Sequence, residues 1–239
     1  MNVQAYKEQL EQPWGKLYYD IVFELLGNIE NKKILDFGSG FGKISSFLAE
    51  KNQVTAIEPN KEMLAERCTD FPYQQLQGSI ERLQELADQS FDLIICHNVL
   101  EYVSEPSIFL KEFNRLLVED GLVSIVKHNA VGRVMQTVVF ENNPAKAQDF
   151  LNGKTYQTHS MGQATIYELS ELLEANQLQI QSYQGIRIFY GLQPNSMKTA
   201  ADWREKMLAM ELAVYDQSPY RDIAQFQHVW LKKQKRTPK

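Results

Sequence analysis

Short apolar runs alternate with segments of helical periodicity through the first half of the chain. The strand-like runs cover residues 32–37, 53–58, 73–78, 91–97 and 122–128. The helix-like segments cover residues 42–51, 60–69, 81–88 and 106–118. Strands that alternate with helices form right-handed βαβ units, and strands that are apolar throughout are typical of a parallel sheet buried on both faces. The pattern therefore predicts an α/β fold on a mostly parallel sheet.

The pattern changes after residue 128. Residues 129–162 have short helical stretches interrupted by glycine and proline and no strand signal, which indicates a small helical cap inserted after the fifth strand. Residues 165–177 and 201–216 have the periodicity of helices. Residues 179–191 and 226–234 alternate as antiparallel strands do. These two strands complete a predicted seven-stranded sheet.

Glycine and proline set the expected element boundaries. Pro13 and Gly15 are predicted to precede a helix at residues 17–26, and Gly121 is predicted to end the helix that begins at Pro106. We expect one Rossmann-like domain over residues 1–239, with helices on both faces of the sheet. Residues 1–30 are expected to form a helical cover.

Composition narrows the class of protein. The chain has 239 residues, of which 44% are hydrophobic and 23% charged, as in ordinary globular proteins. No stretch approaches the ~20 apolar residues that a membrane helix needs, and the N-terminus lacks the basic start and apolar core of a secretory signal. A cytoplasmic protein that contacts no membrane is expected. The net charge of −5 disfavours non-specific binding to a phosphate backbone.

Neither cysteine nor histidine spacing indicates a metal site. Cys68 and Cys96 lie far apart in the chain and are predicted to be packing residues. The histidines are scattered and form no ligand pair: they are His97, His128, His159 and His228. We therefore expect no bound metal.

A glycine-rich turn follows the first predicted strand. The sequence from Asp36 to Gly42 is DFGSGFG, directly before an apolar-periodic helix. Glycine is needed where the chain takes a positive φ or where a ligand approaches the backbone closely. A nicotinamide-dinucleotide fingerprint would have its third glycine at position 43, which is Lys43. The DxGxGxG spacing is instead that of S-adenosylmethionine (SAM) methyltransferases.

Glu58 supports this interpretation because it ends the second strand. An acid at that position can accept hydrogen bonds from both ribose hydroxyls of a nucleoside. Taken singly, the glycines also fit an ordinary tight turn and Glu58 fits a helix-start acid. Their joint occurrence on adjacent strand ends favours the cofactor site.

Two more strand ends contribute candidates. After the third strand, Ser79, Ile80 and Glu81 are predicted to line the adenine; alternatively, Ser79 caps the next helix. His97 ends the fourth strand, at the crevice where α/β sheets bind ligands, and is predicted to contact the cofactor or substrate. A structural histidine is the alternative.

The segments DFGSGFGK, AIEPN, GSIERL and CHNVLEYV together resemble class I SAM-dependent methyltransferases. In addition, HNVLEYV, QGIRIFY and MELAVYDQSPYRDIAQFQHVWLKK are similar to segments of the bacterial tRNA 5-carboxymethoxyuridine methyltransferases. That family esterifies the carboxylate of a modified wobble uridine. The resemblance implies SAM as cofactor, S-adenosylhomocysteine as product and tRNA as a candidate partner.

The resemblance also assigns residues. The family's glycine turn falls on Gly38 and Gly40, its ribose-binding acid on Glu58 and its adenine loop on Ile80. An N-terminal helix around Trp14 to Tyr19 is implied to close over the methionine end of SAM, with Tyr18 and Tyr19 where the family has an arginine. The candidate cofactor-binding residues are therefore Trp14, Tyr18, Asp36, Gly38, Ser39, Gly40, Glu58, Pro59, Ser79, Ile80, Glu81 and His97.

The acceptor remains open at this level. A carboxylate acceptor needs a cation rather than a base, and Arg187 and Arg133 are the candidates, with His97, for the catalytic site. Surface ion pairs are the alternative role for both arginines. Rival hypotheses are a small-molecule O- or C-methyltransferase of metabolism and a SAM-binding regulatory protein without turnover. The chain is expected to be a monomer or a homodimer.

Overall fold

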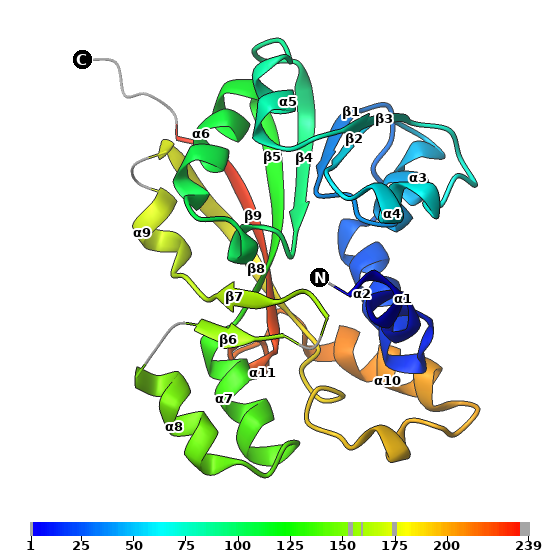
Figure 1. The fold of residues 1–239 in the computed structure, drawn as a ribbon, viewed down its shortest axis with the longest axis vertical. Coiled ribbons are helices and arrows are strands. Elements are labelled where there is room, and N and C mark those ends of the chain that lie inside the picture. Colours follow the sequence, from blue (N-terminus) through cyan, green and yellow to red (C-terminus); the bar gives the residue numbers. More distant parts are fainter. Residues whose placement is uncertain (1, 153–154, 159, 174–175, 235–239) are drawn as a thin grey trace. The chain divides into compact units, whose positions relative to one another are not determined.

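The computed structural model describes residues 2–152, 155–158, 160–173 and 176–234, and its largest element is a seven-stranded sheet (Figure 1). The strand order is β3-β2-β1-β4-β5-β9-β8. The strands are β1 (Lys33–Phe37), β2 (Gln53–Glu58), β3 (Gln74–Gln77), β4 (Phe91–His97), β5 (Leu117–His128), β8 (Leu178–Ile186) and β9 (Phe226–Lys233). All seven predicted strands are thus present.

The first five strands pair in parallel, with β1 between β2 and β4. In this register Asp36 lies beside Ala56 on one side and Ile95 on the other. Ile34 and Leu35 have no exposed surface, as expected for a strand covered on both faces. The predicted mostly parallel α/β architecture is confirmed.

Two compact units make up the chain. We call residues 28–126, 168–182 and 229–234 the motif unit, because it contains the glycine-rich turn. Residues 2–27, 127–167 and 183–228 form the accessory unit. The accessory unit thus combines the predicted N-terminal cover and the predicted cap with a C-terminal segment.

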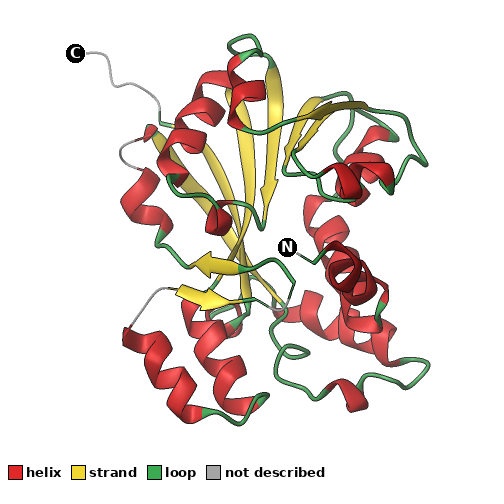
Figure 2. Ribbon diagram, in the orientation of Figure 1, coloured by secondary structure: helices red, strands yellow, loops and turns green. Residues whose placement is uncertain are grey.

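The helices of the motif unit follow the strands in alternation (Figure 2). They are α3 (Lys43–Ala49), α4 (Lys61–Ala65), α5 (Ile80–Gln84), η1 (Leu100–Tyr102), α6 (Pro106–Leu116) and α9 (Leu169–Leu173). Figure 1 shows α3 and α4 on one side of the strands and α5, α6 and α9 on the other. Pro106 begins α6, where its missing N–H costs no hydrogen bond.

Gly121 does not end a helix, contrary to the prediction. Helix α6 stops at Leu116, and β5 begins at once with Leu117 opposite Phe91. The next paired residue on β5 is Leu122, opposite Leu93, so extra residues form a bulge between these pairs. A Cβ at Gly121 would lie 2.7 Å from Leu117 Cγ and 3.0 Å from a backbone oxygen of β4. The glycine is therefore required by close packing inside the bulge.

The accessory unit consists mainly of helices. They are α1 (Val3–Glu11), α2 (Pro13–Leu26), α7 (Ala130–Val139), α8 (Pro144–Asn152), η3 (Asn195–Met197), α10 (Trp203–Val214) and α11 (Tyr220–Ile223). Helix α1 lies within the helical cover predicted for residues 1–30, although its own bounds were not predicted. Gly15 lies inside α2 rather than before it. A Cβ at this position would be 2.2 Å from the Gln9 carbonyl oxygen of α1. The two helices can pack this closely only with glycine at that position.

Three boundaries in the second half also differ from prediction. Residues Thr155–Gln157 (β6) and Gln163–Thr165 (β7) pair as a small antiparallel sheet, although no strand was predicted in residues 129–162. Helix α9 begins at Leu169 rather than at 165, because Thr165 belongs to β7. Strand β8 ends at Ile186, because Arg187 adopts a left-handed φ of +65°.

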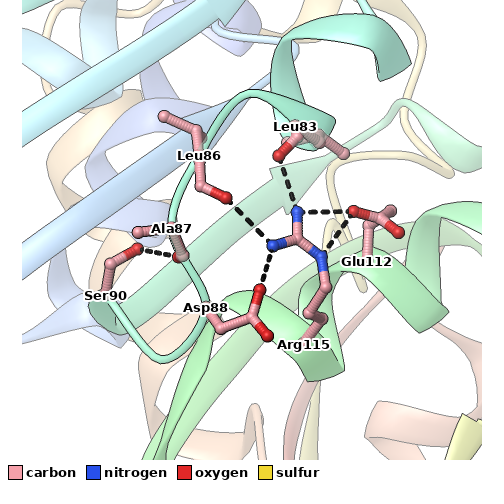
Figure 3. A network of polar contacts seen from close by, with 7 residues as sticks. All are labelled: Leu83, Leu86, Ala87, Asp88, Ser90, Glu112 and Arg115. Atoms are coloured by element: carbon pink, nitrogen blue, oxygen red, sulfur yellow. Dashed lines mark hydrogen bonds and ion pairs between the residues drawn. The ribbon is translucent and has the colours of Figure 1, made fainter.

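A single arginine fastens α6 to the segment that follows α5 (Figure 3). Arg115 donates from Nη2 to the Leu83 carbonyl at 2.8 Å and from Nη1 to the Leu86 carbonyl at 2.9 Å. It also forms ion pairs with Asp88 at 2.5 Å and Glu112 at 2.7 Å. One planar fork of donors thus binds the Leu86 carbonyl and adds a bond to the Leu83 carbonyl, which also accepts the Leu86 N–H at 3.1 Å.

We expect Arg115→Met to lower the free energy of unfolding by about 2 kcal/mol, because charge-assisted hydrogen bonds are lost at a partly exposed site. Arg115→Lys is expected to recover less than half of that loss, since an ammonium cannot reach the same set of acceptors. Urea titration followed by circular dichroism measures both. Lys146→Met, which removes an exposed ion pair, is the matched control and should change stability by less than about 0.5 kcal/mol. Equal losses for the arginine and control variants would contradict the assigned role.

Candidate functional site

The glycine-rich turn lies at the carboxyl end of β1, in the motif unit. Gly38, Gly40 and Gly42 have φ values of +76°, +55° and +66°, a region that disfavours other residues. The N–H groups of Gly38 and Ser39 both donate to the Ile57 carbonyl of β2, at 2.8 and 3.0 Å. The turn is therefore held against the end of the neighbouring strand.

The three glycines have different surroundings. A Cβ on Gly38 would lie 2.3 Å from Val99 Cγ2, and one on Gly42 would lie 2.1 Å from the Tyr73 hydroxyl. At Gly40 the nearest atom is Met63 Sδ, at 3.9 Å. Gly38 and Gly42 are thus required by packing as well as by φ. Gly40 instead leaves open space where a ligand can approach the backbone.

Glu58 joins the ends of β1 and β2. Its Oε2 accepts the Gly40 N–H at 2.9 Å and its Oε1 accepts the Asn60 N–H at 2.8 Å. The residue is 6% exposed. Burial raises the pKa of this carboxyl, and the two backbone hydrogen bonds oppose that rise. Each oxygen retains a second lone pair, which suits hydroxyl donors such as those of a ribose. Pro59, which lies between Glu58 and Asn60 in the chain, is exposed.

Asp36, at the end of β1, is bonded to helix α3. Ser45 Oγ donates to Asp36 Oδ2 at 2.5 Å, and Asp36 is 2% exposed. Burial raises the pKa of Asp36 to about 7, and the nearby charge of Glu58 contributes to the rise. Ser45 was missed in the sequence, although a serine on the apolar face of a helix is a signal that could have identified it.

The predicted adenine loop contains Ser79, Ile80 and Glu81 at the start of α5. Ser79 is the N-cap residue of α5, as the alternative has it, and its carbonyl accepts the Arg82 N–H at 3.1 Å, but its side chain forms no capping bond. Its N–H donates instead to Glu81 Oε1 at 2.7 Å. Ser79 and Ile80 are half-buried and Glu81 is exposed. Contact of all three with adenine stays a prediction.

His97 ends β4, as predicted. Its Nε2 lies 2.8 Å from the hydroxyl of Ser124, a fully buried residue of β5. This contact sets the plane of the imidazole at the carboxyl end of the sheet. Ser124 could not be identified in the sequence, because it occupies a strand position where serine has no distinct pattern.

Trp14 and Tyr18 lie on α2, in the accessory unit. The Trp14 ring faces Lys198 Nζ at 5.4 Å, and the Tyr18 ring packs edge-on against Phe226 at 5.6 Å. The candidates of the motif unit, from Asp36 to His97, in contrast lie at or just after the carboxyl ends of the parallel strands β1 to β4. The role of Trp14 and Tyr18 toward a cofactor stays a prediction.

The two candidate arginines are also in the accessory unit. Arg133 donates to His128 Nδ1 and, at 2.8 Å, to Gln136 Oε1. Burial and the charge of Arg133 lower the pKa of His128 well below its usual range, so its ring is a neutral acceptor. The hydrogen bonds of Arg133 to His128 and to Gln136 are not the surface ion pair that was the alternative hypothesis for this arginine.

Arg187 lies in a different environment. Its guanidinium lies over the Tyr190 ring at 5.2 Å, and its buried Nε has no acceptor among the described residues. Burial lowers its pKa, although an arginine remains charged. The sequence did not identify Tyr190 or Lys198 as members of this cluster, although Tyr190 ends the segment QGIRIFY that carries the family resemblance.

Within the described part of the chain, no group of three or more acidic, cysteine or histidine residues could hold a metal. His159 lies outside that part. No helix among the described residues is long and apolar enough to cross a membrane. Cys96 is buried and Cys68 is half-buried.

Comparison with known proteins finds similarity to methyltransferases. A family model described as a methyltransferase domain matches residues 35–125. The chain is 28% identical over 137 residues to a thiol S-methyltransferase of Mus musculus, which covers 54% of this chain and 55% of that protein. It is 30% identical over 115 residues to a ubiquinone biosynthesis O-methyltransferase of Alkalilimnicola ehrlichii, covering 45% and 46%. The matches thus span about half the length of these relatives.

Solved structures extend the likeness to the whole fold. A SAM-dependent methyltransferase from Thermotoga maritima has a TM-score of 0.64 at 17% identity, covering 97% of this chain and 96% of that one. The 1,6-didemethyltoxoflavin-N1-methyltransferase of Burkholderia thailandensis has a TM-score of 0.54 at 17% identity, covering 94% and 79%. The chain therefore has the Rossmann-like fold of class I SAM-dependent methyltransferases.

The buried Asp36 predicts a pH dependence of stability. Its pKa is about 7 in the folded chain against 3.8 for a free carboxyl, so the folded state binds the proton more tightly. Its contribution to stability is therefore largest at low pH and is lost as pH rises from about 4 to 7. Asp36→Asn has no titrating group at this position. Its free energy of unfolding, relative to the wild type, should rise by up to about 4 kcal/mol between pH 4 and 8.

Urea unfolding of both proteins at several pH values measures this difference, in which other titrating groups cancel. A Ser45→Ala variant serves as control for loss of the hydrogen bond alone. A difference between wild type and Asp36→Asn that does not change with pH would show that Asp36 has an ordinary pKa.

Proposed function

We propose that this protein is a SAM-dependent methyltransferase that converts SAM to S-adenosylhomocysteine. The observation that carries the proposal is the Gly40 N–H bonded to Glu58, beside a turn with open space at Gly40. The match of residues 35–125 to a methyltransferase domain supports it. The Burkholderia thailandensis neighbour contains bound S-adenosylhomocysteine, which supports the same cofactor here.

The residues of the motif unit fit the parts of an adenosyl group. Glu58 would accept the ribose hydroxyls with the lone pairs that its two backbone bonds leave free. The turn from Gly38 to Gly40 would let the cofactor approach the main chain, and Ile80 would provide apolar surface for adenine. His97 would contact the cofactor or the acceptor from the end of β4.

SAM supplies a methyl group already activated by its sulfonium. The acceptor atom forms a bond to the methyl carbon as the carbon–sulfur bond breaks, and that electron pair goes to sulfur. The protein therefore contributes proximity, in-line alignment and exclusion of water rather than acid–base chemistry. A carboxylate acceptor has no proton to lose, so it needs a cation that holds it while one oxygen stays free to attack.

We further propose that the acceptor is a carboxylate, as in 5-carboxymethoxyuridine of tRNA, and that Arg187 binds it. Arg187 is half-buried, and its buried Nε has no hydrogen-bond partner among the described residues, which supports a role in holding an anion. A small-molecule acceptor is the second candidate, because the relatives found are named for thiol and ubiquinone-pathway methylation.

Loss of Glu58 should weaken cofactor binding. We expect Glu58→Ala to lower the affinity for S-adenosylhomocysteine at least tenfold, since hydrogen bonds from ribose hydroxyls to a charged acceptor contribute roughly 1.5 to 3 kcal/mol each. Isothermal titration calorimetry measures the affinity, and circular dichroism verifies folding. Glu62→Ala, at an exposed acid of α4, is the control and should bind normally. NAD is not expected to bind either protein. Unchanged affinity in Glu58→Ala would refute this cofactor placement.

Arg187 is tested by a conservative substitution. Arg187→Lys should lower the turnover of tRNA bearing 5-carboxymethoxyuridine substantially, because a point charge does not reproduce the bidentate guanidinium. Affinity for S-adenosylhomocysteine should stay within about twofold. Arg204→Lys, at an arginine paired with Asp20 in the same unit, is the control. If only acceptors without a carboxylate are methylated, the carboxylate proposal is wrong and the small-molecule alternative is preferred.

A further inference from the structure

Lys198 is a buried lysine with very few polar contacts. It is 1% exposed, and its ammonium donates one hydrogen bond, to Asn195 Oδ1 at 2.9 Å. Three aromatic rings surround it: Trp14, Phe140 and Tyr190 lie 5.4, 5.6 and 5.9 Å from Nζ. No carboxylate of the described residues forms an ion pair with it. An ammonium without a counterion is costly in such a place, and cation–π contacts offset only part of that cost.

Tyr190 connects this lysine to Arg187. Its ring contacts both cations, with the Arg187 guanidinium at 5.2 Å, and the residue has no exposed surface. Its buried hydroxyl has no hydrogen-bond partner among the described residues, and neither has Arg187 Nε. The Arg187 and Lys198 cations therefore both lie near the Tyr190 ring, and these two side chains and the Tyr190 hydroxyl all have unused donors. Buried donors in native proteins are normally satisfied.

A buried acid, Glu211, attracts Arg187 electrostatically but is bonded mainly to the backbone. Glu211 is 1% exposed, and its oxygens accept the N–H groups of Ile188, Phe189 and Tyr190 at 2.8, 2.8 and 3.2 Å. Those bonds hold the backbone of the segment that carries Arg187 and Tyr190. They leave the carboxylate without an ion pair to Arg187 in the described structure. The cluster thus has an excess of positive charge and of donors.

A second buried lysine shows the contrast. Lys127, 2% exposed, also lies over an aromatic ring, that of Tyr167. Its ammonium donates to the His128 carbonyl at 2.9 Å and to Gln227 Oε1 at 3.3 Å. Lys127 therefore has the hydrogen-bond acceptors expected of a structural lysine. The ammonium of Lys198 has one such acceptor, Asn195, three residues earlier in the chain.

We propose that Arg187, Tyr190 and Lys198 form a binding subsite for an oxyanion, and that its ligand is the acidic group of the methyl acceptor. Each residue provides a donor: Arg187 Nε, the Tyr190 hydroxyl and Lys198 Nζ. The shared chemistry is a carboxylate or a phosphate, held where aromatic walls exclude water and strengthen the attraction. The identity of the ligand as the acceptor rests on the proposed methyl transfer, but the existence of the subsite does not.

The subsite is expected to lose affinity in alkaline solution. Burial, and then the charge of Arg187, lower the pKa of Lys198 to about 8. The charged or titratable groups of this cluster are Arg187, which stays positive, Glu211, whose pKa burial raises, and Tyr190, whose pKa burial raises well above its usual range. Trp14, Phe140 and Asn195 carry no charge. A bound anion favours the ammonium, so binding should weaken as pH rises through about 8 and beyond.

Thermal-shift titration of the cofactor-free protein tests the subsite. Phenoxyacetate is the carboxylate probe, phenoxyacetamide its uncharged match and inorganic phosphate the second oxyanion, all at constant ionic strength. We expect phenoxyacetate at ten times its Kd to raise the Tm by about 3 to 5 °C at pH 7 and the amide to have no effect. The phosphate arm decides which oxyanion the subsite prefers.

Two variants separate binding from folding. Lys198→Met and Tyr190→Phe should raise the Tm of the free protein by about 2 to 4 °C, because each removes an unsatisfied buried group. Both should lose at least tenfold in affinity for the oxyanion, and Lys198→Met should lose its pH dependence. Lys127→Met should instead lower the Tm. Lys206→Met, at an exposed lysine of α10, should change neither property.

Absence of any oxyanion effect on the wild type, or equal binding by wild type and both variants, would overturn the subsite. Competition assigns the ligand: an oxyanion that binds the subsite should inhibit methylation of the tRNA acceptor, and failure to compete would overturn the assignment to the acceptor. These measurements of binding use no SAM. Their outcome is therefore distinguishable from failure of the proposed methyl transfer itself.

Discussion

The hydrogen bond from the Gly40 N–H to the Glu58 carboxylate is the constraint on which the site depends. A buried carboxylate must be satisfied, and here two backbone N–H groups satisfy it from segments that follow β1 and β2. The parallel pairing of these strands brings the two segments to one edge of the sheet. The glycines then allow the turn to reach Glu58. The pairing of β1 and β2, the conformation of the glycine-rich turn and the burial of Glu58 therefore depend on one another.

Both units bury ionisable side chains, and the accessory unit buries an acid as well as cations, since Glu211 and Lys198 are each 1% exposed. The motif unit buries Asp36 and Glu58, and burial raises the pKa of both. The accessory unit holds Arg187 and Lys198 in a buried cluster with unused donors. Both features cost folding free energy, as is common at functional sites.

Much of the fold could be predicted because it follows from local patterns. Apolar runs identified the strands, and glycine spacing with Glu58 identified the candidate cofactor site. The errors involve contacts between distant segments. Gly15 is a packing glycine between two helices and Gly121 lies in a bulge of β5, yet both resemble boundary residues in the sequence. The strand expected to reach 191 stops at 186 because Arg187 has a positive φ, which no local signal indicates.

The sequence by itself determined the α/β architecture and the chemistry at the strand ends, because periodicity and turn residues act over a few positions of the chain. Only the tertiary structure decided which polar side chains are buried without partners. Trp14 and Phe140 come from distant helices to enclose Lys198, and Tyr190 and Arg187 join it from the segment after β8. Burial depends on what packs against a residue, and no short pattern in the sequence records that.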